Sequence, residues 1–460
     1  MTLRLVAQTA AAWSVRIGRL SALIGLVSAF GVFGIPHAEA GIVPHRFTTP
    51  NGLTVLVVEQ HALPIVHLQA TIRAGASQDP PDKAGIANLV AGLLDEGTTS
   101  RSAVQIAEQI EFLGASLSTR TEADYSSASL RVLKKDLARG AELFADILLH
   151  PAFPEREVER VRRQILGQIM GEQDEPETIA SKAFHGLVFE GHPYRWPVVG
   201  TEATLPTITR GDLLGFYQRE YLPNQTMLVL VGDLTVEEAK TLVTTHFAGW
   251  ATGPSPTRQA GIPKPVAKPV TRLIDKDLTQ ATIMLGHVGI SRANPDFYAV
   301  TVMNYILGAG GFSSRLMDSV RDNQGLAYGI HSAYEANVVP GAFLVSLQTR
   351  NASASQALTS VITELRQIRQ SPVTDQELSE AKSYLIGSFP LRFDTTAKLA
   401  DVLSLVELHG LGLDYFSDYP KRIGQVTKDD VLRVARQYLH PDQYALVVVG
   451  KLAEAKIAVP

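Results

Sequence analysis

The stretch from Gly85 to Thr98, GIANLVAGLLDEGT, can form a helix with one chemically useful face. Its apolar residues recur at the spacing of a buried helical stripe: Ile86, Leu89, Val90, Leu93 and Leu94. The opposite face presents Asn88, Ala91 and Gly92, followed one turn later by Asp95. Three neighbours placed like the first three can hold zinc and activate a water molecule when they are histidines and a glutamate. Here the three side chains are a carboxamide at Asn88, a methyl group at Ala91 and a single hydrogen at Gly92.

With His, Glu and His at positions 88, 91 and 92, this face would read H-x-x-E-H, the inverted zinc-peptidase motif. The stretch resembles the pitrilysin/insulinase family of zinc peptidases, whose pattern is roughly G-L-A-H-F-L-E-H-M-L-F-x-G-T. Five positions of that pattern are kept: Gly85, Ala87, Leu94, Gly97 and Thr98. The two zinc-binding histidines are replaced by Asn88 and Gly92, and the general base is replaced by Ala91.

The resemblance also implies a third zinc ligand, a glutamate further along the chain. The matching stretch is Leu166-Gly167-Gln168-Ile169, with an acidic run and Pro176 after it. Gln168 aligns with the ligand, or Gly167 if the alignment shifts by one residue, and neither is acidic. A catalytic zinc needs three imidazole or anionic ligands and an open position for water. Asn, Gly and Gln supply at most two weak amide oxygens, so we expect no catalytic metal in this chain.

A later segment keeps residues that contact substrate in the family. Phe312-Ser313-Ser314-Arg315-Leu316 opens a predicted helix to about Asn323, and Leu326-Ala327-Tyr328-Gly329 follows. The segment resembles the family pattern S-R-L-x-x-x-x-R-x-x-x-G-L-A-Y, with Arg321 and Tyr328 at the matching positions. In active members this pair, from the half opposite the zinc, binds substrate near the scissile bond. A guanidinium can donate in a fork to a carbonyl or carboxylate, and a phenol can donate to an oxyanion.

On spacing alone, Arg321 could equally be a solvated helix residue and Tyr328 a half-buried strand aromatic. The surrounding match favours substrate contact. One functional half is erased and the other is kept, which resembles the non-catalytic subunit of heterodimeric pitrilysin-type peptidases. The resemblance implies a chain that is inactive alone and helps to hold peptides in a chamber. A homologous H-x-x-E-H partner would cut them, so zinc is expected in the partner and no cofactor here.

The alternative function is a peptide-binding or scaffold pseudoenzyme without any peptidase activity. A retained Arg321/Tyr328 pair favours the first hypothesis, because scaffolding does not need it. Independent hydrolysis at another site has little support, since the sequence has no G-x-S-x-G motif, no cysteine and no identifiable triad.

Residues 1–40 have the pattern of a secretory signal peptide. Three arginines precede an apolar run from Leu20 to Ile35, and Ala38-Glu39-Ala40 forms a small-residue cleavage site. An uncleaved anchor is the other interpretation, but the run is shorter than the roughly 20 residues that a span needs. We therefore expect export to a bacterial periplasm, which a chain without cysteine suits, and no stable membrane span after cleavage. The mature chain would carry a net charge of −6, which argues against a nucleic-acid partner.

The elements that must position these residues occur twice. Thr209-x-x-Asp212 leads through a proline turn to the apolar run Leu228–Gly232, and Thr427-x-x-Asp430 leads in the same way to Leu446–Gly450. Between the repeats, residues 251–270 contain five prolines and form a predicted stiff linker. We predict two homologous domains, about 41–250 and 271–460, each a mostly antiparallel sheet packed with helices, and thus an α+β fold. The family resemblance implies the same duplication.

Several finer expectations follow from patterning. Val66 to Ile72 alternates with His67, Gln69 and Thr71, which predicts a strand with one buried and one solvated face. Gly308-Ala309-Gly310-Gly311 lacks the residues of a phosphate loop and indicates a hinge or a close backbone approach. His185 and His192, with Glu190 between them, are expected to be structural. Among the other histidines, His287 and His331 flank the Arg/Tyr segment and are candidates to line a cavity.

Overall fold

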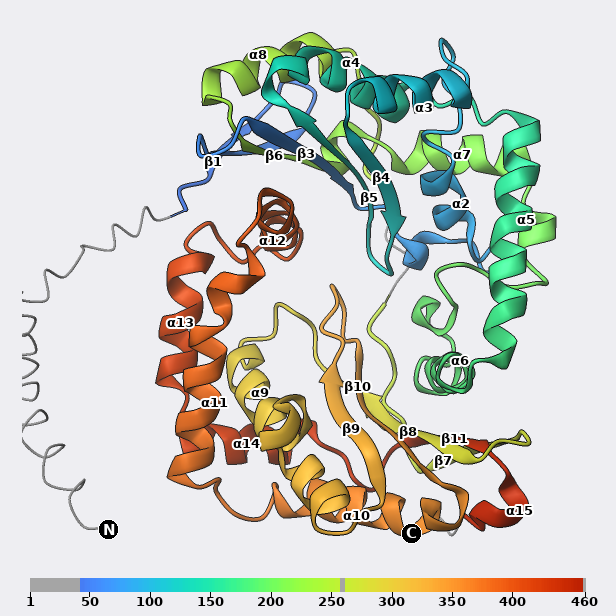
Figure 1. Cartoon of the computed structure of the whole chain (residues 1–460), viewed down its shortest axis with the longest axis vertical. Helices are drawn as coiled ribbons and strands as arrows, with labels where there is room; N and C mark the ends of the chain where they lie inside the picture. Colours follow the sequence, from blue (N-terminus) through green and yellow to red (C-terminus); the bar gives the residue numbers. More distant parts are fainter. Residues whose placement is uncertain (1–41, 257–260, 458–460) are drawn as a thin grey trace, which may run out of the picture. The chain divides into compact units, whose positions relative to one another are not determined.

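The computed structural model describes residues 42–256 and 261–457, so the predicted signal segment lies outside the described residues. The prediction of an α+β fold with two homologous domains is confirmed (Figure 1). The first sheet has the strand order β1-β2-β6-β3-β5-β4 and the second has the order β7-β11-β8-β10-β9. The strands of the first sheet are β1 His45–Thr48, β2 Thr54–Glu59, β3 Ile65–Ile72, β4 Ser116–Thr121, β5 Ser126–Leu133 and β6 Thr226–Gly232. Those of the second are β7 Val270–Asp275, β8 Gln280–Val288, β9 Ala327–Tyr334, β10 Ala342–Arg350 and β11 Ala445–Gly450.

The internal repeat of the sequence corresponds to equivalent parts of the two sheets. Strand β6 pairs parallel with β2 and antiparallel with β3. Strand β11 pairs parallel with β7 and antiparallel with β8 in the same way. The Thr-x-x-Asp sequences are capping boxes that start the preceding helices, α7 Arg210–Glu220 and α14 Lys428–Tyr438.

Helices cover the two sheets and supply their cores. The remaining α-helices of the first half are α2 Ile86–Gly92, α3 Ala103–Phe112, α4 Leu137–Leu149, α5 Glu155–Gly171, α6 Pro176–Val188 and α8 Val236–Phe247. Those of the second half are α9 Phe297–Asn304, α10 Ala354–Gln367, α11 Asp375–Gly387, α12 Thr396–Leu408, α13 Tyr415–Gln425 and α15 Leu452–Ala455. Each half contains a large apolar core of its own.

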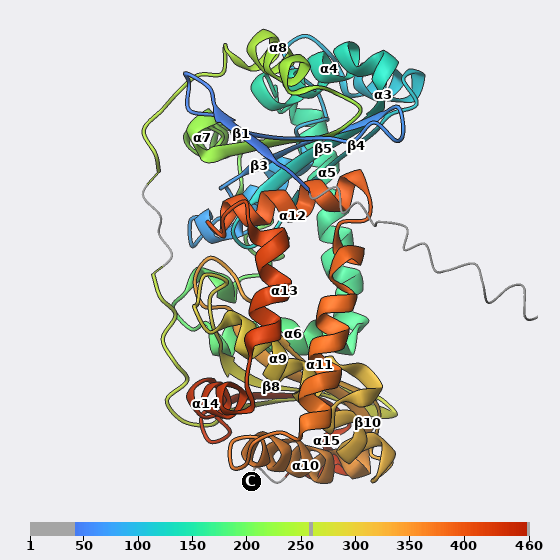
Figure 2. The same ribbon diagram turned by 90° about the vertical axis from the view of Figure 1, so that its left-hand side faces the viewer.

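Two helices are exchanged between the halves. Helix α6 belongs to the first half by sequence but packs on β8 and β11 of the second sheet, where Phe184 contacts the apolar cluster around Met284 and Val447. Helix α12 belongs to the second half but packs on β3 and β6 of the first sheet. Figures 1 and 2 show α12 against the upper sheet and α6 beside the lower one. Each sheet therefore buries one face against a helix from the other half of the sequence.

This exchange corrects the expectation for β3. We predicted that His67, Gln69 and Thr71 face solvent, but their exposed fractions are 5%, 3% and 0%. Helix α12 covers them, and the Gln69 side-chain amide donates to Asp401 Oδ1 at 3.0 Å and to Ser404 Oγ at 3.2 Å. An alternating pattern shows which face of a strand is polar, but it does not show whether that face is exposed. Here a helix with polar side chains covers the polar face.

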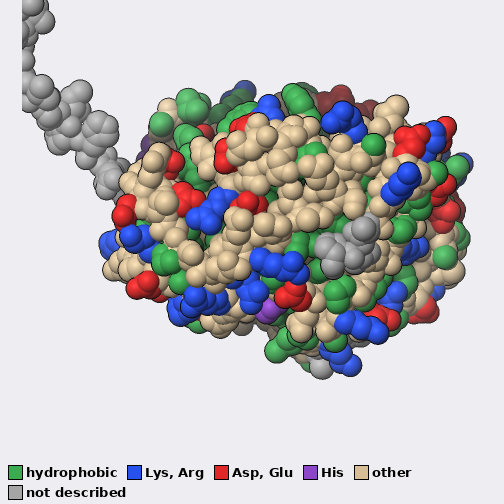
Figure 3. All heavy atoms as spheres, turned by 90° about the horizontal axis from the view of Figure 1, so that it is seen from below, with side chains coloured by type: hydrophobic (Ala, Val, Ile, Leu, Met, Phe, Trp, Pro, Cys, Tyr) green, Lys and Arg blue, Asp and Glu red, His purple; other side chains and the backbone are tan. Residues whose placement is uncertain are grey.

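None of the helices in residues 42–256 and 261–457 is long and apolar enough to cross a membrane. The stretches 251–256 and 261–269 contain neither helix nor strand. Figure 3 shows Lys and Arg side chains interspersed with Asp and Glu over the face seen from below in Figure 1.

Candidate functional site

Helix α2, which carries the zinc-motif positions, starts at a tightly constrained turn. Gly85 has a φ of +99°, and a Cβ there would lie 2.8 Å from the Cα of Gly200. Only glycine accommodates both conditions. The buried Asp79 carboxylate accepts the backbone N–H groups of Gly85 at 2.7 Å and Ala87 at 3.1 Å. Burial raises the pKa of Asp79 to about 8, although these N–H groups oppose the shift by favouring the carboxylate.

Helix α2 is shorter than predicted, since it ends at Gly92 and leaves Asp95 beyond it, and its ligand positions offer no donor set for zinc. Asn88 and Gly92 are partly exposed, whereas Ala91 is 1% exposed. The helix ends at Gly92, whose Cβ position lies 4.0 Å from Val161 of α5. One amide oxygen is the only side-chain acceptor at these three positions, so they do not fit a catalytic zinc.

The aligned third position does not complete the set. Gln168 is exposed on α5, and its amide donates to Glu172 Oε1 at 2.8 Å. Glu172 in turn accepts Lys182 Nζ at 2.6 Å. Gly167 is also exposed and has no atom within 4 Å of its Cβ position. Within residues 42–256 and 261–457, no group of three or more His, Asp or Glu is arranged to hold a metal ion.

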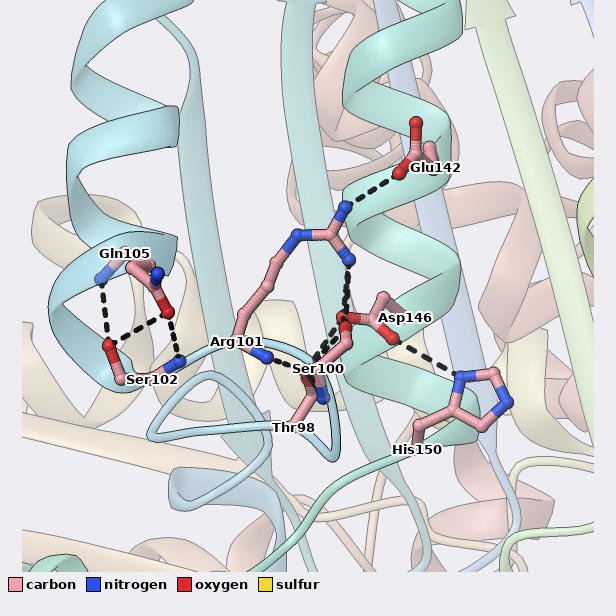
Figure 4. Close-up of polar contacts among 8 residues, drawn as sticks. All are labelled: Thr98, Ser100, Arg101, Ser102, Gln105, Glu142, Asp146 and His150. Carbon is pink, nitrogen blue, oxygen red and sulfur yellow. Dashed lines mark hydrogen bonds and ion pairs between the residues drawn. The ribbon is translucent and has the colours of Figure 1, made fainter.

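The end of the motif-like stretch is held by a polar network around Asp146 of α4 (Figure 4). Its carboxylate accepts Thr98 Oγ1 at 2.7 Å, Ser100 Oγ at 3.0 Å and Arg101 Nη1 at 2.7 Å. Burial opposes ionisation, but these hydrogen bonds outweigh it and lower the pKa of Asp146. Thr98 therefore has a structural role in the loop that follows α2.

Arg321 and Tyr328 come together in the second half. Arg321 lies in a π-helical segment, Met317–Asp322, where we had predicted regular helix, and Tyr328 is the second residue of β9. The Arg321 guanidinium carbon lies 5.6 Å from the ring centre of Tyr328 and 4.9 Å from that of Phe312. Phe312 and Tyr328 are 74% and 86% exposed. The pair is thus an accessible cation–aromatic group, and Phe312 is a third member that the spacing did not reveal.

An irregularity in the β9–β10 pairing sets the direction of Tyr328. Ile330 pairs with Leu347 and Ala327 pairs with Thr349, so Tyr328 and Gly329 together oppose the single residue Gln348. In unbroken alternation, Tyr328 would share the buried face of Ile330. Because a β-bulge re-aims the side chains beside it, we infer that Tyr328 faces the same side as Gln348. That face carries Gln348, whose amide donates to Glu177 of the exchanged helix α6 at 2.9 Å.

The glycine cluster positions this segment by close approach. A Cβ at Gly308 would lie 2.5 Å from Ser332 Oγ and 2.8 Å from the Ser332 nitrogen of β9. Gly308 lies in a π-helical turn, Tyr305–Ala309, that continues α9. The turn can therefore sit against the strand that carries Tyr328.

A cavity of about 1120 Å³ lies between the second sheet and the two exchanged helices. Its lining includes His185 of α6, His331 of β9, Ser346 of β10 and Leu405 of α12. His331 and Ser346 are paired residues on the same sheet face as Gln348. Tyr328 thus shares the face that borders the cavity, although neither Arg321 nor Tyr328 belongs to its lining. The four zinc-motif positions are outside the lining as well, but Glu172, the partner of Gln168, belongs to it.

The histidines have distinct positions around this cavity. His185 Nε2 lies 2.9 Å from Glu335 Oε2 across the two halves. Burial disfavours the charged ring, but Glu335 outweighs burial and raises the pKa of His185. His192 is structural, since it accepts the Tyr194 N–H and contacts the Gly261 carbonyl at 2.9 Å. Of the two candidates to line a cavity, His331 does, whereas His287 packs against His440, and burial lowers the pKa of His287 to about 3.

Comparisons with known proteins identify the class. Residues 54–202 match the family described as insulinase (peptidase family M16), and residues 207–385 match the peptidase M16 inactive domain. An uncharacterized zinc protease of Mycobacterium tuberculosis is 29% identical over 419 residues, which cover 89% of this chain and 94% of that protein. The uncharacterized zinc protease YmxG of Bacillus subtilis is 25% identical over 406 residues, covering 88% and 98%.

Solved structures agree with this assignment. The peptidase M16 inactive domain from Pseudomonas fluorescens has a TM-score of 0.84 at 29% identity, covering 89% of this chain and 98% of that one. A protease from Helicobacter pylori has a TM-score of 0.83 at 21% identity, covering 89% and 100%, and supports the fold alone. The chain belongs to the pitrilysin/insulinase (M16) family of peptidases and lacks its zinc motif. The match to the inactive domain covers residues 207–385 and does not include positions 88–92. The loss of the zinc ligands is therefore inferred from the residue types at those positions.

Proposed function

We propose that this chain is the non-catalytic, substrate-binding subunit of a zinc peptidase that degrades or processes peptides. Its partner would be a homologous subunit that carries H-x-x-E-H and binds the zinc. The proposal includes export to the periplasm, on the evidence of residues 1–40, and an assembled heterodimer.

One combination supports the proposal: α2 lacks the donor set for zinc, while the exposed Tyr328 lies beside Arg321 at an irregularity of the β9–β10 pairing. An irregular strand pairing that exposes a tyrosine does not contribute to the core of the second half. It leaves the phenol of Tyr328 exposed beside the guanidinium of Arg321, which comes from the preceding π-helical segment. Strand β9 is an edge strand with one free side, which is the kind of surface to which an extended peptide adds as a further strand.

The isolated mature chain should show no peptide hydrolysis, with or without added zinc. The purified pair should hydrolyse peptides, and Tyr328→Phe in this chain should slow turnover about a hundredfold, the scale for one oxyanion donor. Association of the two subunits should be unchanged. Tyr384→Phe is the matched control, because Tyr384 is 58% exposed in the same half but lies on α11.

Three results would count against the proposal or part of it. Chelator-sensitive hydrolysis by the isolated chain would make it an enzyme in its own right. Failure of an H-x-x-E-H homologue from the same cells to associate with the chain, together with peptide binding by the chain alone, would favour the alternative of a binding or scaffold pseudoenzyme. An equal rate for the Tyr328→Phe pair would remove Tyr328 from the substrate site.

A further inference from the structure

One end of the cavity is lined by two arginines that have no ion-pair partner among residues 42–256 and 261–457. Arg292 lies between β8 and α9, and Arg392 ends the short helical turn Phe389–Arg392 that precedes α12. Both line the cavity together with His409 and Tyr415. Four separate segments of the second half therefore bring positive and polar groups to one place.

Aromatic rings hold the two guanidinium groups in position. The Arg292 guanidinium carbon lies 3.7 Å from the ring centre of Phe297 and 5.5 Å from that of Tyr415. The Arg392 guanidinium carbon lies 5.1 Å from the ring centre of Tyr419. Tyr415 and Tyr419 contact each other, with ring centres 5.8 Å apart. A guanidinium stacked on a ring keeps its N–H donors at its edge, where they can take a further acceptor.

Three carboxylates of the surrounding segments are engaged elsewhere. Asp296 pairs with Arg433 at 2.8 Å, and Asp394 pairs with Lys398 at 2.8 Å. Glu407, near the end of α12, pairs with Arg46 at 2.9 Å. Within the described part of the chain, no ion pair joins Arg292 or Arg392 to these carboxylates, or to the acidic residues that line the same cavity: Glu122, Asp124, Glu172, Glu177 and Glu335.

Burial and the neighbouring arginines change the pKa of His409. Burial, followed by the charges of Arg292 and Arg73, lowers the pKa of His409 to about 4. The ring is therefore neutral at physiological pH and available as a hydrogen-bond donor or acceptor. Arg73 donates to the Leu408 carbonyl at 2.9 Å and so closes the end of α12 beside it.

We propose that Arg292 and Arg392 bind a carboxylate of a peptide at this end of the cavity. A planar guanidinium matches a carboxylate with parallel donors, and the contact strengthens where water is partly excluded. Leu405, which is 37% exposed on the cavity wall, and the ring of Tyr415 provide apolar contacts for the adjoining side chain. The carboxylate can come from the C-terminus of the peptide or from an Asp or Glu side chain.

This inference rests on the proposed function for the kind of ligand, a peptide, while the carboxylate site itself rests on the geometry. The test uses the mature full chain and a dansyl-labelled hexapeptide made of Ala and Leu. The peptide is prepared in three forms: with a free C-terminal carboxylate, with a C-terminal amide, and with a C-terminal amide and Glu as its last residue. Binding is measured by fluorescence anisotropy. N-acetyl-leucine and its amide, followed by calorimetry, report on the carboxylate site without a peptide.

We expect the free acid to bind about tenfold more tightly than the amide, the factor that about 1.4 kcal/mol supplies. The Arg292→Gln/Arg392→Gln variant should lose this ratio and keep the affinity for the amide. Arg392 is exposed, so Arg392→Gln alone should fold in any case and should reduce the ratio. Arg195→Gln is the matched control, because Arg195 also lines the cavity and stacks on an aromatic ring, Trp196, at 4.9 Å. It should leave the ratio unchanged.

The outcomes separate the two proposals. Equal binding of acid and amide, or a ratio lost in Arg195→Gln but kept in the double variant, would overturn the carboxylate site and leave peptide binding intact. Binding of N-acetyl-leucine, but of none of the hexapeptides, would support the site and count against the proposed function. Failure of every ligand would overturn both. Tight binding of the Glu-ended amide would assign the site to acidic side chains as well as to the terminus.

Discussion

Replacing Gln69 with alanine tests whether α12 covers the first sheet in solution. The Gln69 amide is buried and joins β3 to two residues of α12, Asp401 and Ser404. Asp401 Oδ1 also accepts Arg120 Nη2 of β4 at 2.6 Å. These contacts fix the helix that forms one wall of the cavity, so their loss should loosen that wall.

The magnitude follows from the two hydrogen bonds. A bond to a charged group contributes about 1.5–3 kcal/mol and a neutral one about 0.5–1.5 kcal/mol. The Asp401 side chain is 38% exposed and keeps Arg120 as a partner, so the first value is discounted for screening. We expect Gln69→Ala to cost about 2 kcal/mol against local opening of α12, or about thirtyfold faster exchange of its amide hydrogens.

Hydrogen exchange followed by mass spectrometry is the suitable assay, because a two-lobed chain of this size need not unfold in one step. A double-mutant cycle of Gln69→Ala with Asp401→Ala should give a coupling of about 1 kcal/mol, as for residues in contact. Asp394→Ala is the control, since it removes only an exposed pair with Lys398 and should change exchange about twofold or less. Additive single effects would refute the reasoning, because they would mean that β3 and α12 do not touch.

Three further predictions follow from other contacts. Because Glu335 outweighs burial and raises the pKa of His185, their contact is fully formed below the ordinary histidine pKa of about 6.5 and weakens as the pH rises through the raised value. Glu335 is 36% exposed, so solvent screening limits the effect to about 1 kcal/mol. The amide hydrogens of α6 should therefore exchange about fivefold faster at pH 8 than at pH 6, after correction for intrinsic exchange rates. His185→Gln should abolish this difference. Asp146→Ala should free the loop after α2 at a cost of about 2 kcal/mol and open the bond after Arg101 to trypsin, whereas Glu142→Ala, whose side chain is 58% exposed, should not. Gly308→Ala should lower the thermal midpoint and the activity of the assembled pair, because its Cβ would overlap Ser332 of β9, whereas Gly329→Ala has open space and should do neither.

Much of the fold could be predicted because its signals are local. The Thr-x-x-Asp sequences identify the repeated helices through capping, which involves residues only three apart. The solvated face expected for β3 was wrong for the opposite reason. Gln69 meets Asp401 across 332 residues, and no pattern around β3 contains that information. The exchange of α6 and α12 is therefore invisible to periodicity.

Part of the candidate site could likewise be predicted from the sequence, and part could not. The loss of the zinc ligands can be read from the sequence, because three positions of one helix are neighbours by geometry alone. The direction of Tyr328 cannot, since it depends on how β9 and β10 pair. Arg292, Arg392 and His409 come from separate segments, and each alone is an ordinary surface residue by type. Only the fold assembles them.

The arrangement explains how the Arg321/Tyr328 segment can keep its geometry in a chain that lacks the zinc motif. Tyr328 is directed by the β9–β10 pairing, by Gly308 against Ser332 and by the Arg321 guanidinium, and all of these lie within the second half. Nothing that orients it involves Asn88, Ala91 or Gly92. Replacement of the ligands therefore releases no constraint on the tyrosine. Helix α2 has a structural role of its own, because it contributes Ile86, Leu89 and Val90 to the core of the first half. The ligand positions of α2 can therefore change without altering the contacts that orient Tyr328.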